Sequence, residues 1–377
     1  MKVLRVGVAV AMLELGIFVA GYLAYWIIDR PGDLDFGSQY AAAYIGVHYG
    51  WGHLYDTSLI GPIEAANHLD GYAPFQHPPP DAWLAVPFLL LPLRWAALIW
   101  QALLLGALVA SALIISPARR WNRVFALLSV AGFQPCLVAL GYGTMSPVVL
   151  ILLCGALIAL ESDAPLLAGV LLGMTALKPQ LTLLVIPVIL AAGYWKTAVI
   201  AVAVMAALAL ASAAVMGAAG TRDYVTFLLS PGAINHQMPL TIKSLVGVGP
   251  SIVAWTGIVL VAAAAVSFRF RLRPDTALVL GILSSLFVAE HLNVGDLVLW
   301  LLPIWLAFRT ERPFWLKATA GATWIAGWFA IGLPAVCVAM EAVLAVGFVV
   351  AAARARPVPP RAPAASAIRL PASAPER

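Results

Sequence analysis

The chain has 377 residues, of which 63% are hydrophobic and only 10% are charged. Because a soluble domain carries roughly 25% charged residues, this composition excludes an ordinary soluble protein and predicts a membrane protein. The net charge of +5 does not indicate nucleic-acid binding, since most basic residues fall in one set of loops between apolar segments. The three cysteines lie in apolar stretches without metal-ligand spacing, and we expect them to be packing residues.

Apolar stretches that approach the roughly 20 residues needed to cross a bilayer recur along the chain. Residues 6–27 form the first, which we interpret as a retained anchor because no small-residue cleavage site clearly follows it. We expect residues 1–353 to form a single all-α membrane domain, and the Pro-, Ala- and Arg-rich residues 354–377 to form a disordered cytoplasmic tail. The predicted spans are residues 6–27, 95–115, 124–140, 147–160, 197–217, 251–267, 276–289, 295–308, 318–331 and 335–353.

Two segments do not fit a simple alternation of spans. Residues 82–92 are apolar but short and are interrupted by prolines, which predicts an interfacial or partly inserted helix. Residues 165–192 carry Lys178-Pro179 at their centre, and both flanks should be cytoplasmic. We therefore expect two short spans or a re-entrant hairpin, because broken backbone at membrane depth is tolerated only against protein or a wet cavity.

Lysine and arginine are distributed unequally between the two sets of loops. Of the 22, seventeen lie in the loops and tail on one side of the predicted spans, whereas four lie on the other side and Lys178 falls within an apolar segment. The positive-inside rule makes the richer side cytoplasmic, and both termini are then cytoplasmic. All six histidines and ten of the seventeen carboxylates face outward in this arrangement.

The largest outward loop, residues 28–81, is the candidate reaction centre, because titratable groups near a bilayer are costly and tend to mark function. It opens with the helix breaker Pro31-Gly32, followed by Asp33 and Asp35. In one interpretation Asp33 caps a helix and Asp35 favours its dipole; in the other, a carboxylate performs chemistry. On a helix the two are about 200° apart, so only one could face a given site.

His77 stands before three prolines at the end of this loop, where the chain cannot continue a helix. The run predicts a rigid extended corner, either as a structural turn or as one wall of a site. His53, His68 and His77 match no recognised zinc spacing, so we expect no metal centre. A divalent cation could assist only if the fold brought together carboxylates such as Asp35, Asp56 and Asp296.

Lys178 is predicted to lie at or below the outer interface, where a lysine either snorkels to the lipid headgroups or serves a function. A compact ammonium at this depth suits the phosphate of a lipid carrier. Other polar groups of the outward loops could join this anion site or the rim of its cavity, or simply face solvent: Arg222, His236, Lys243, Glu290 and His291.

The order of several short motifs resembles glycosyltransferase family 87, whose members have the GT-C architecture. The matching pieces are Asp35-Phe36, Gly52-His53-Leu54-Tyr55-Asp56, Phe75-Gln76-His77-Pro78-Pro79, Gly143, the Gly-x-x-x-Gly-x-x-x-x-Lys-Pro pattern from Gly169 to Pro179, and the polar turn before Asp296-Leu297. Their order across most of residues 30–310 carries the resemblance. Three places depart from it: Thr144 stands where glutamine is common, His77 where an aromatic residue is commoner, and Glu290-His291 where Ser-Pro is more usual.

The resemblance implies a bundle of about 10–13 transmembrane helices and an inverting glycosyl transfer on the outer face of the bacterial cytoplasmic membrane. Asp35 matches the acidic position of the family and would be the catalytic base, Lys178 matches the Lys-Pro position, and Asp33 has no clear counterpart. The expected donor is a hexose, mannose by analogy, or a pentose, carried on a polyprenyl phosphate. The expected acceptor is a lipid-anchored or envelope glycan, and no cofactor is clearly required.

The residues agree with this chemistry. A polyprenyl phosphate is already a good leaving group, so one carboxylate that deprotonates the acceptor hydroxyl suffices, while Lys178 could stabilise the departing phosphate. No Gly-rich nucleotide-binding loop is found. Two alternatives stay open. A transporter or flippase of a lipid-linked sugar predicts charged relays or symmetry between halves, and a scaffold subunit predicts that each loop charge tolerates substitution.

Overall fold

The computed structural model describes residues 13, 14, 16, 17, 21, 35–66, 75–116, 120–229, 240–242, 250–309 and 312–354. Within these residues every regular element is a helix, and several helices are long and apolar enough to cross a membrane. The chain is therefore an all-α polytopic membrane protein, as its composition predicts.

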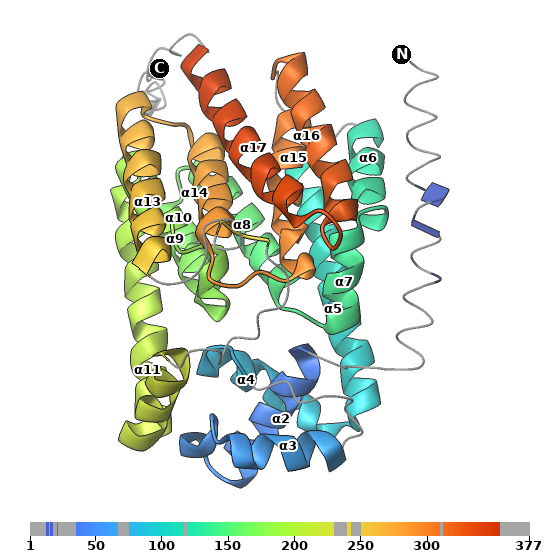
Figure 1. Ribbon diagram of the computed structural model, residues 1–377, viewed down its shortest axis with the longest axis vertical. Helices are drawn as coiled ribbons and strands as arrows, with labels where there is room; N and C mark the ends of the chain where they lie inside the picture. The colour runs from blue at the N-terminus through green and yellow to red at the C-terminus, as the bar shows by residue number, and fades with distance from the viewer. Residues whose placement is uncertain are drawn as a thin grey trace, which may run out of the picture.

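Three short helices begin the continuous part of the described chain at residue 35, and they lie together at one end of the molecule (Figure 1). They are α2 (Asp35–His48), α3 (Thr57–Ala66) and α4 (Pro79–Ala85), joined by the 3-10 turn η1 (Trp51–His53). Together we call these four elements the α2–α4 layer. The turn η2 (Val86–Leu90) then leads from α4 into the helix bundle, which matches the short, proline-interrupted segment predicted at residues 82–92.

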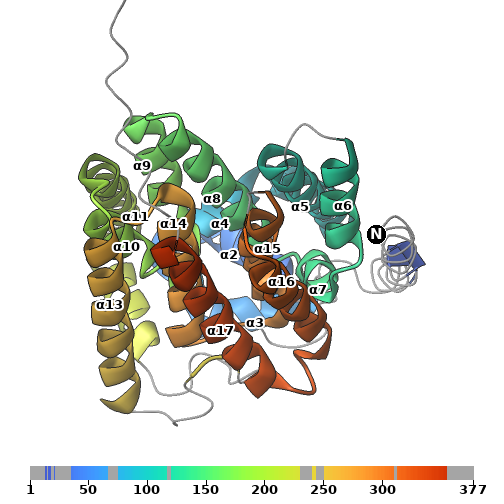
Figure 2. The ribbon, with the colours of Figure 1, turned by 90° about the horizontal axis from the view of Figure 1, so that it is seen from above.

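The bundle follows in one continuous series of helices. It consists of α5 (Leu93–Ile115), α6 (Arg120–Ala131), α7 (Gln134–Tyr142), α8 (Ser146–Glu161), α9 (Pro165–Met174), α10 (Val185–Ala191), α11 (Trp195–Leu229), α13 (Pro250–Phe270), α14 (Pro274–Val288), α15 (Leu301–Arg309), α16 (Phe314–Ala326) and α17 (Pro334–Arg354), with the 3-10 turns η3 (Thr175–Leu177), η4 (Pro179–Leu181), η5 (Val294–Trp300) and η6 (Gly327–Phe329). Seen from above, α5, α6 and α7 lie on one side and α9, α10, α11 and α13 on the other (Figure 2).

Several predicted spans are realised as continuous helices and others as bent or short ones. Four described helices are long and apolar enough to cross a membrane: α5, α11, α13 from Val253, and α17. The span predicted at 124–140 is a pair of helices bent by 57° between Ala131 and Gln134, and it makes a fifth candidate. The apolar helices α8, α9 with η3, and α14 are shorter. The first predicted span, 6–27, lies almost wholly outside the described residues.

The segment predicted to break at Lys178-Pro179 does break there. It consists of α9, the turns η3 and η4 on either side of Lys178, and α10. Gly169 and Gly173 let α9 approach α11 closely, because an added Cβ would lie 2.5 Å from the Cβ atoms of Ile200 and Val204 respectively. The broken segment is thus held against the neighbouring helices rather than exposed, as membrane-depth backbone requires.

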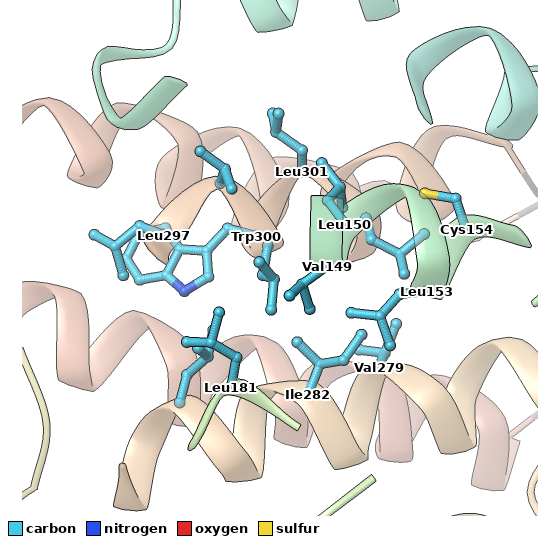
Figure 3. Close-up of a cluster of buried hydrophobic side chains, with 14 of the residues drawn as sticks. Val149, Leu150, Leu153, Cys154, Leu181, Val279, Ile282, Leu297, Trp300 and Leu301 are labelled. Atoms are coloured by element: carbon cyan, nitrogen blue, oxygen red, sulfur yellow. The ribbon is translucent and has the colours of Figure 1, made fainter. Parts of the chain in front are cut away.

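The centre of the bundle is apolar and closely packed (Figure 3). Side chains from α8, η4, α14 and the η5–α15 segment meet there, and the labelled members of the cluster are buried: Val149, Leu150, Leu153, Cys154, Leu181, Val279, Ile282, Leu297, Trp300 and Leu301. All three cysteines are free and buried, which confirms that they serve packing. This core fixes the positions of η4 and η5, the two turns that carry polar side chains toward the α2–α4 layer.

The turns at the opposite end of the bundle carry most of the described basic residues. Two ion pairs connect turns there: Arg309 Nη2 lies 2.7 Å from Glu161 Oε2, and Arg312 Nη2 lies 2.7 Å from Asp275 Oδ2. The C-terminal end of α17 lies at the same end of the molecule (Figure 1). The bundle therefore has one basic end, and the α2–α4 layer lies at the other.

Candidate functional site

A pocket of ≈ 240 Å³ lies where the α2–α4 layer meets the broken segment and the turn after α14. It draws on residues far apart in the sequence, and most of its lining side chains are polar. The lining residues are Asp35, Gln76, His77, Pro78, Lys178, Pro179, Gln180, Tyr224, Leu228, Glu290, His291 and Asn293.

Asp35 is the first residue of α2, and the packing of Phe36 determines where this carboxylate lies. The Phe36 ring stacks on Trp100 with centroids 5.4 Å apart, and Trp100 Nε1 donates a 2.7 Å hydrogen bond to the carbonyl of Gly143. A Cβ added at Gly143 would come within 2.7 Å of Phe36 Cβ, and its φ of +71° is in the left-handed region that favours glycine. This glycine thus lets the start of α2 close onto the turn that carries Thr144.

The environment of Asp35 suits a group that accepts a proton. Burial raises the pKa of its carboxyl above the usual value, while the Lys178 charge and a hydrogen bond from Thr144 oppose the rise. The side chain is only half-buried and lines the pocket, so a ligand hydroxyl can reach it. A general base works best when its pKa is tuned toward the working pH and it lies within hydrogen-bond reach of the proton.

Lys178 lines the pocket but is almost wholly buried, and three oxygens hold its ammonium group. Its Nζ lies 2.6 Å from Asp296 Oδ1, 2.8 Å from Thr144 Oγ1 and 3.3 Å from Ser146 Oγ. Ser146 also donates to Asp296 Oδ1, and the backbone N–H of Asn293 donates to Asp296 Oδ2 at 2.8 Å. An ammonium has three hydrogens, so these contacts account for all of them. The protein tolerates the buried charge of Lys178 because the ammonium is paired with a carboxylate and hydrogen-bonded.

His77 lines the pocket from the corner that its three prolines were predicted to form. Pro78 has the extended torsions φ −59° and ψ 151°, and α4 begins immediately after it at Pro79. The hydroxyl of Tyr55 donates a 2.8 Å hydrogen bond to the His77 carbonyl, which ties the corner to the α2–α4 layer. Both interpretations of the corner therefore hold: it ends the loop and it forms one wall of the pocket.

The structure brings five of the predicted site residues to this pocket and leaves one elsewhere. Those at the pocket are Asp35, His77, Lys178, Glu290 and His291. Arg222 is exposed on α11 and lines a separate surface hollow, although Tyr224 and Leu228 of the same helix reach the pocket. Asp33, His236 and Lys243 lie outside the described residues, as does His68.

Several pocket residues were not predicted. Gln76 and Asn293 lie inside motifs that were recognised and Gln180 directly follows one, so these amide side chains could have been found from their neighbours. Tyr224 and Leu228 gave no signal, because they follow the predicted span 197–217 on a continuation of α11. α11 kinks at Gly217, where the predicted span ends, and its last turns run beside the α2–α4 layer (Figure 1).

The carboxylates do not form a metal-binding group in the described part of the chain. No three His, Cys, Asp or Glu side chains gather there in a way that could hold an ion. Asp56 is bonded instead to Ser58, with its Oδ1 2.6 Å from the Ser58 hydroxyl. The pocket offers two carboxylates, Asp35 and Glu290, near a buried ion pair, together with amides and imidazoles that can hydrogen-bond a polyhydroxylated ligand.

Comparison with known proteins gives one family. The model of glycosyltransferase family 87 matches residues 75–292, which is more than half of the chain. No curated protein and no solved structure matches the chain. The matched segment contains His77, Lys178, Glu290 and His291, whereas Asp35 precedes it and Asp296 follows it. The match covers more than half of an all-α membrane protein, and the chain belongs to glycosyltransferase family 87.

Proposed function

We propose that this glycosyltransferase moves a hexose, mannose by analogy with its family, or a pentose, from a polyprenyl-phosphate donor to a hydroxyl of a lipid-anchored or envelope glycan. The reaction takes place on the outer face of the bacterial cytoplasmic membrane. Two facts support a lipid-linked donor: the pocket adjoins membrane-spanning helices, and no nucleotide-binding loop is found in the sequence.

The proposed step is an inverting displacement at the anomeric carbon of the sugar. The acceptor oxygen forms a bond to this carbon while the bond to the phosphate oxygen breaks and its electron pair leaves with the polyprenyl phosphate. The acceptor proton passes to the carboxylate of Asp35. The leaving phosphate needs no proton, so one carboxylate suffices, unlike the two that glycosidases use. The positive charge of Lys178 stabilises the departing phosphate electrostatically, and Asp296 holds the Lys178 ammonium in place.

The observation that carries the proposal is that Asp35 and Lys178 line one pocket. Asp35 comes from the start of α2 and Lys178 from the break between η3 and η4. The Phe36–Gly143 contact places the start of α2 against the turn after α7, and Thr144 of that turn accepts a hydrogen bond from Lys178. A base for the acceptor and a positive charge for the leaving group are the two requirements of this displacement.

The test is sugar transfer by membranes that contain the wild-type chain or Asp35→Asn, with radiolabelled polyprenyl-phosphate-mannose and a lipid extract as acceptor. General-base catalysis contributes about 10²–10⁴-fold, so we expect the Asn variant to lose at least about a hundredfold in rate. Membrane levels of the two proteins are matched by immunoblotting.

Asp223→Asn is the matched control, because Asp223 is an exposed carboxylate on α11 that does not line the pocket. It should retain the wild-type rate. Equal rates for Asp35→Asn and the wild type would remove Asp35 from the mechanism. If the wild type were inactive with the mannose donor, a panel of polyprenyl-phosphate hexoses and pentoses would identify the sugar.

A further inference from the structure

His77 belongs to a buried pair that the reaction proposed above does not use. His77 Nδ1 lies 3.2 Å from Asp81 Oδ2, and the buried amide of Gln39 donates a 3.0 Å hydrogen bond to the same oxygen. Asp81 is buried, and its other oxygen, Oδ1, has no hydrogen-bond partner among the described residues. Because Nδ1 faces Asp81, Nε2 is the ring nitrogen that is left for a ligand in the pocket.

The protons of this pair follow from its surroundings. Burial raises the pKa of the Asp81 carboxyl well above its usual value, and burial together with the Lys178 charge lowers the pKa of His77 to about 3. Two such groups in contact titrate as a pair. If the shared proton is on Asp81, the carboxyl donates to Nδ1 and the imidazole carries its own hydrogen on Nε2. If it is on His77, both ring nitrogens carry hydrogens. As long as the pair keeps its shared proton, Nε2 is a hydrogen-bond donor in either arrangement.

The charges that face His77 decide which ligand this donor suits. Lys178 and His291 make the surroundings more positive and Asp296 makes them more negative, while Asp35 and Glu290 line the same pocket. The three hydrogens of Lys178 already have three acceptors, so its ammonium cannot contact a ligand without giving one of them up. An anion in this pocket would therefore take its hydrogen bonds from other N–H groups of the lining, and Nε2 of His77 is one of them.

We propose that His77 donates a hydrogen bond from Nε2 to a phosphate oxygen of the lipid-linked donor, and that Asp81 and Gln39 are positioning residues that keep the hydrogen on Nε2. The inference rests on the proposed function for the source of the phosphate. It assigns direct contact with the leaving group to His77. The buried Lys178–Asp296 pair acts on the phosphate electrostatically, without a hydrogen bond to it. The bond strengthens as negative charge develops on the phosphate during transfer.

The test measures, by calorimetry, the binding of farnesyl phosphate and of farnesol to the purified protein in detergent. The two ligands share an isoprenyl chain and differ only in the phosphate. His77→Asn places an amide near Nδ1 but has no group at Nε2, whereas His77→Gln reaches the Nε2 position. Hydrogen bonds to charged groups contribute about 1.5–3 kcal/mol, so we expect His77→Asn to bind farnesyl phosphate roughly 10- to 100-fold more weakly. Its farnesol affinity should not change, and His77→Gln should recover most of the loss.

Asp81→Asn tests the positioning role. Gln39 donates to the oxygen that faces His77, so the new amide should turn its own oxygen to that place and accept from Nδ1. The neutral imidazole then lacks a hydrogen on Nε2, and affinity for farnesyl phosphate should fall as it does in His77→Asn, again with farnesol unaffected. ¹⁵N spectra of labelled histidine should show the change of tautomer, which a purely structural role would not produce.

Three results would overturn the proposal: a wild type that binds farnesyl phosphate no more tightly than farnesol, a His77→Asn variant with wild-type affinity for both, or an equal loss for both. Inorganic phosphate, run in parallel, separates an anion site from a lipid site. His53→Asn, an exposed histidine on η1, is the control and should bind as the wild type does. Binding requires no sugar and no transfer, so tight binding without transfer would count against the proposed function alone.

Discussion

Thr144 connects the proposed base to the buried lysine, so its hydroxyl should tune the pH dependence of transfer. It accepts from Lys178 at 2.8 Å, and its hydrogen bond to Asp35 lowers the pKa of that carboxyl. In Thr144→Val this lowering is lost and the pKa of Asp35 rises further. The base is then less ionised at a given acidic pH, so the acid limb of the kcat/KM profile should move to higher pH. On that limb we expect the rate to fall about three- to tenfold.

The measurement is the pH profile of transfer for both proteins, with the rate at high pH as the internal reference. Thr323→Val is the matched control, because Thr323 is a buried threonine of α16 whose hydroxyl bonds only the Thr319 carbonyl at 3.0 Å among the contacts of the described chain. Its profile should coincide with that of the wild type. An acid limb that stays in place in Thr144→Val would show that the hydroxyl does not act on the base.

At the scale of single residues, the sequence identified chemical types well and partnerships poorly. Lys178 was expected either to snorkel to the headgroups or to serve a function, and the structure places it buried in the lining of the pocket. Its partner Asp296 is 118 positions away, and only the packing of η5 against α7 and α8 brings the two together. The pairing of His77 with Asp81 was within reach, since the two are four residues apart, but burial is what gives it chemical meaning.

At the scale of elements, proline and glycine predicted where helices break but not how they pack. The break at Lys178-Pro179 and the short segment after Asp81 were both expected from prolines. The 57° bend between α6 and α7 was not expected, although Pro135 stands in the first turn of α7, and neither was the extension of α11 past Gly217. The part of α11 before its kink at Gly217, residues 195–216, would rise about 33 Å, close to a hydrocarbon core of roughly 30 Å.

The docking of α2 gives a prediction at this scale. Gly143→Ala would place a Cβ 2.7 Å from Phe36 Cβ at a residue with φ +71°. The left-handed conformation costs an alanine about 1–2 kcal/mol, and the contact should push α2, and Asp35 with it, away from the pocket. We expect a lower unfolding temperature in detergent and a reduced transfer rate.

Gly106→Ala separates this effect from a general effect of substituting glycine. Gly106 lies within α5, and an added Cβ there would meet nothing within 4 Å. Alanine should be neutral or stabilise this helix by roughly 0.5–1 kcal/mol. Equal thermal stability and equal activity in Gly143→Ala and the wild type would contradict the role given to the Phe36–Gly143 contact.

At the scale of the whole molecule, one arrangement relates charge, topology and chemistry. The basic turns lie at one end, and the α2–α4 layer and the pocket lie toward the other. The positive-inside rule therefore predicts that the pocket faces outward, where a lipid-linked sugar and an envelope glycan can meet. The buried native cysteines leave the surface free for labelling experiments.

Single cysteines introduced at the two ends should report this orientation. His53→Cys lies on η1 of the α2–α4 layer, and Ser162→Cys lies in the turn between α8 and α9; both positions are exposed. In intact cells a membrane-impermeant maleimide should label the first and not the second, whereas after permeabilisation it should label both. The wild type should remain unlabelled and serves as the control, since burial should keep its three thiols unreactive. Labelling of Ser162→Cys alone in intact cells would place the pocket on the cytoplasmic face, where the donor sugar would have to be presented from the opposite leaflet.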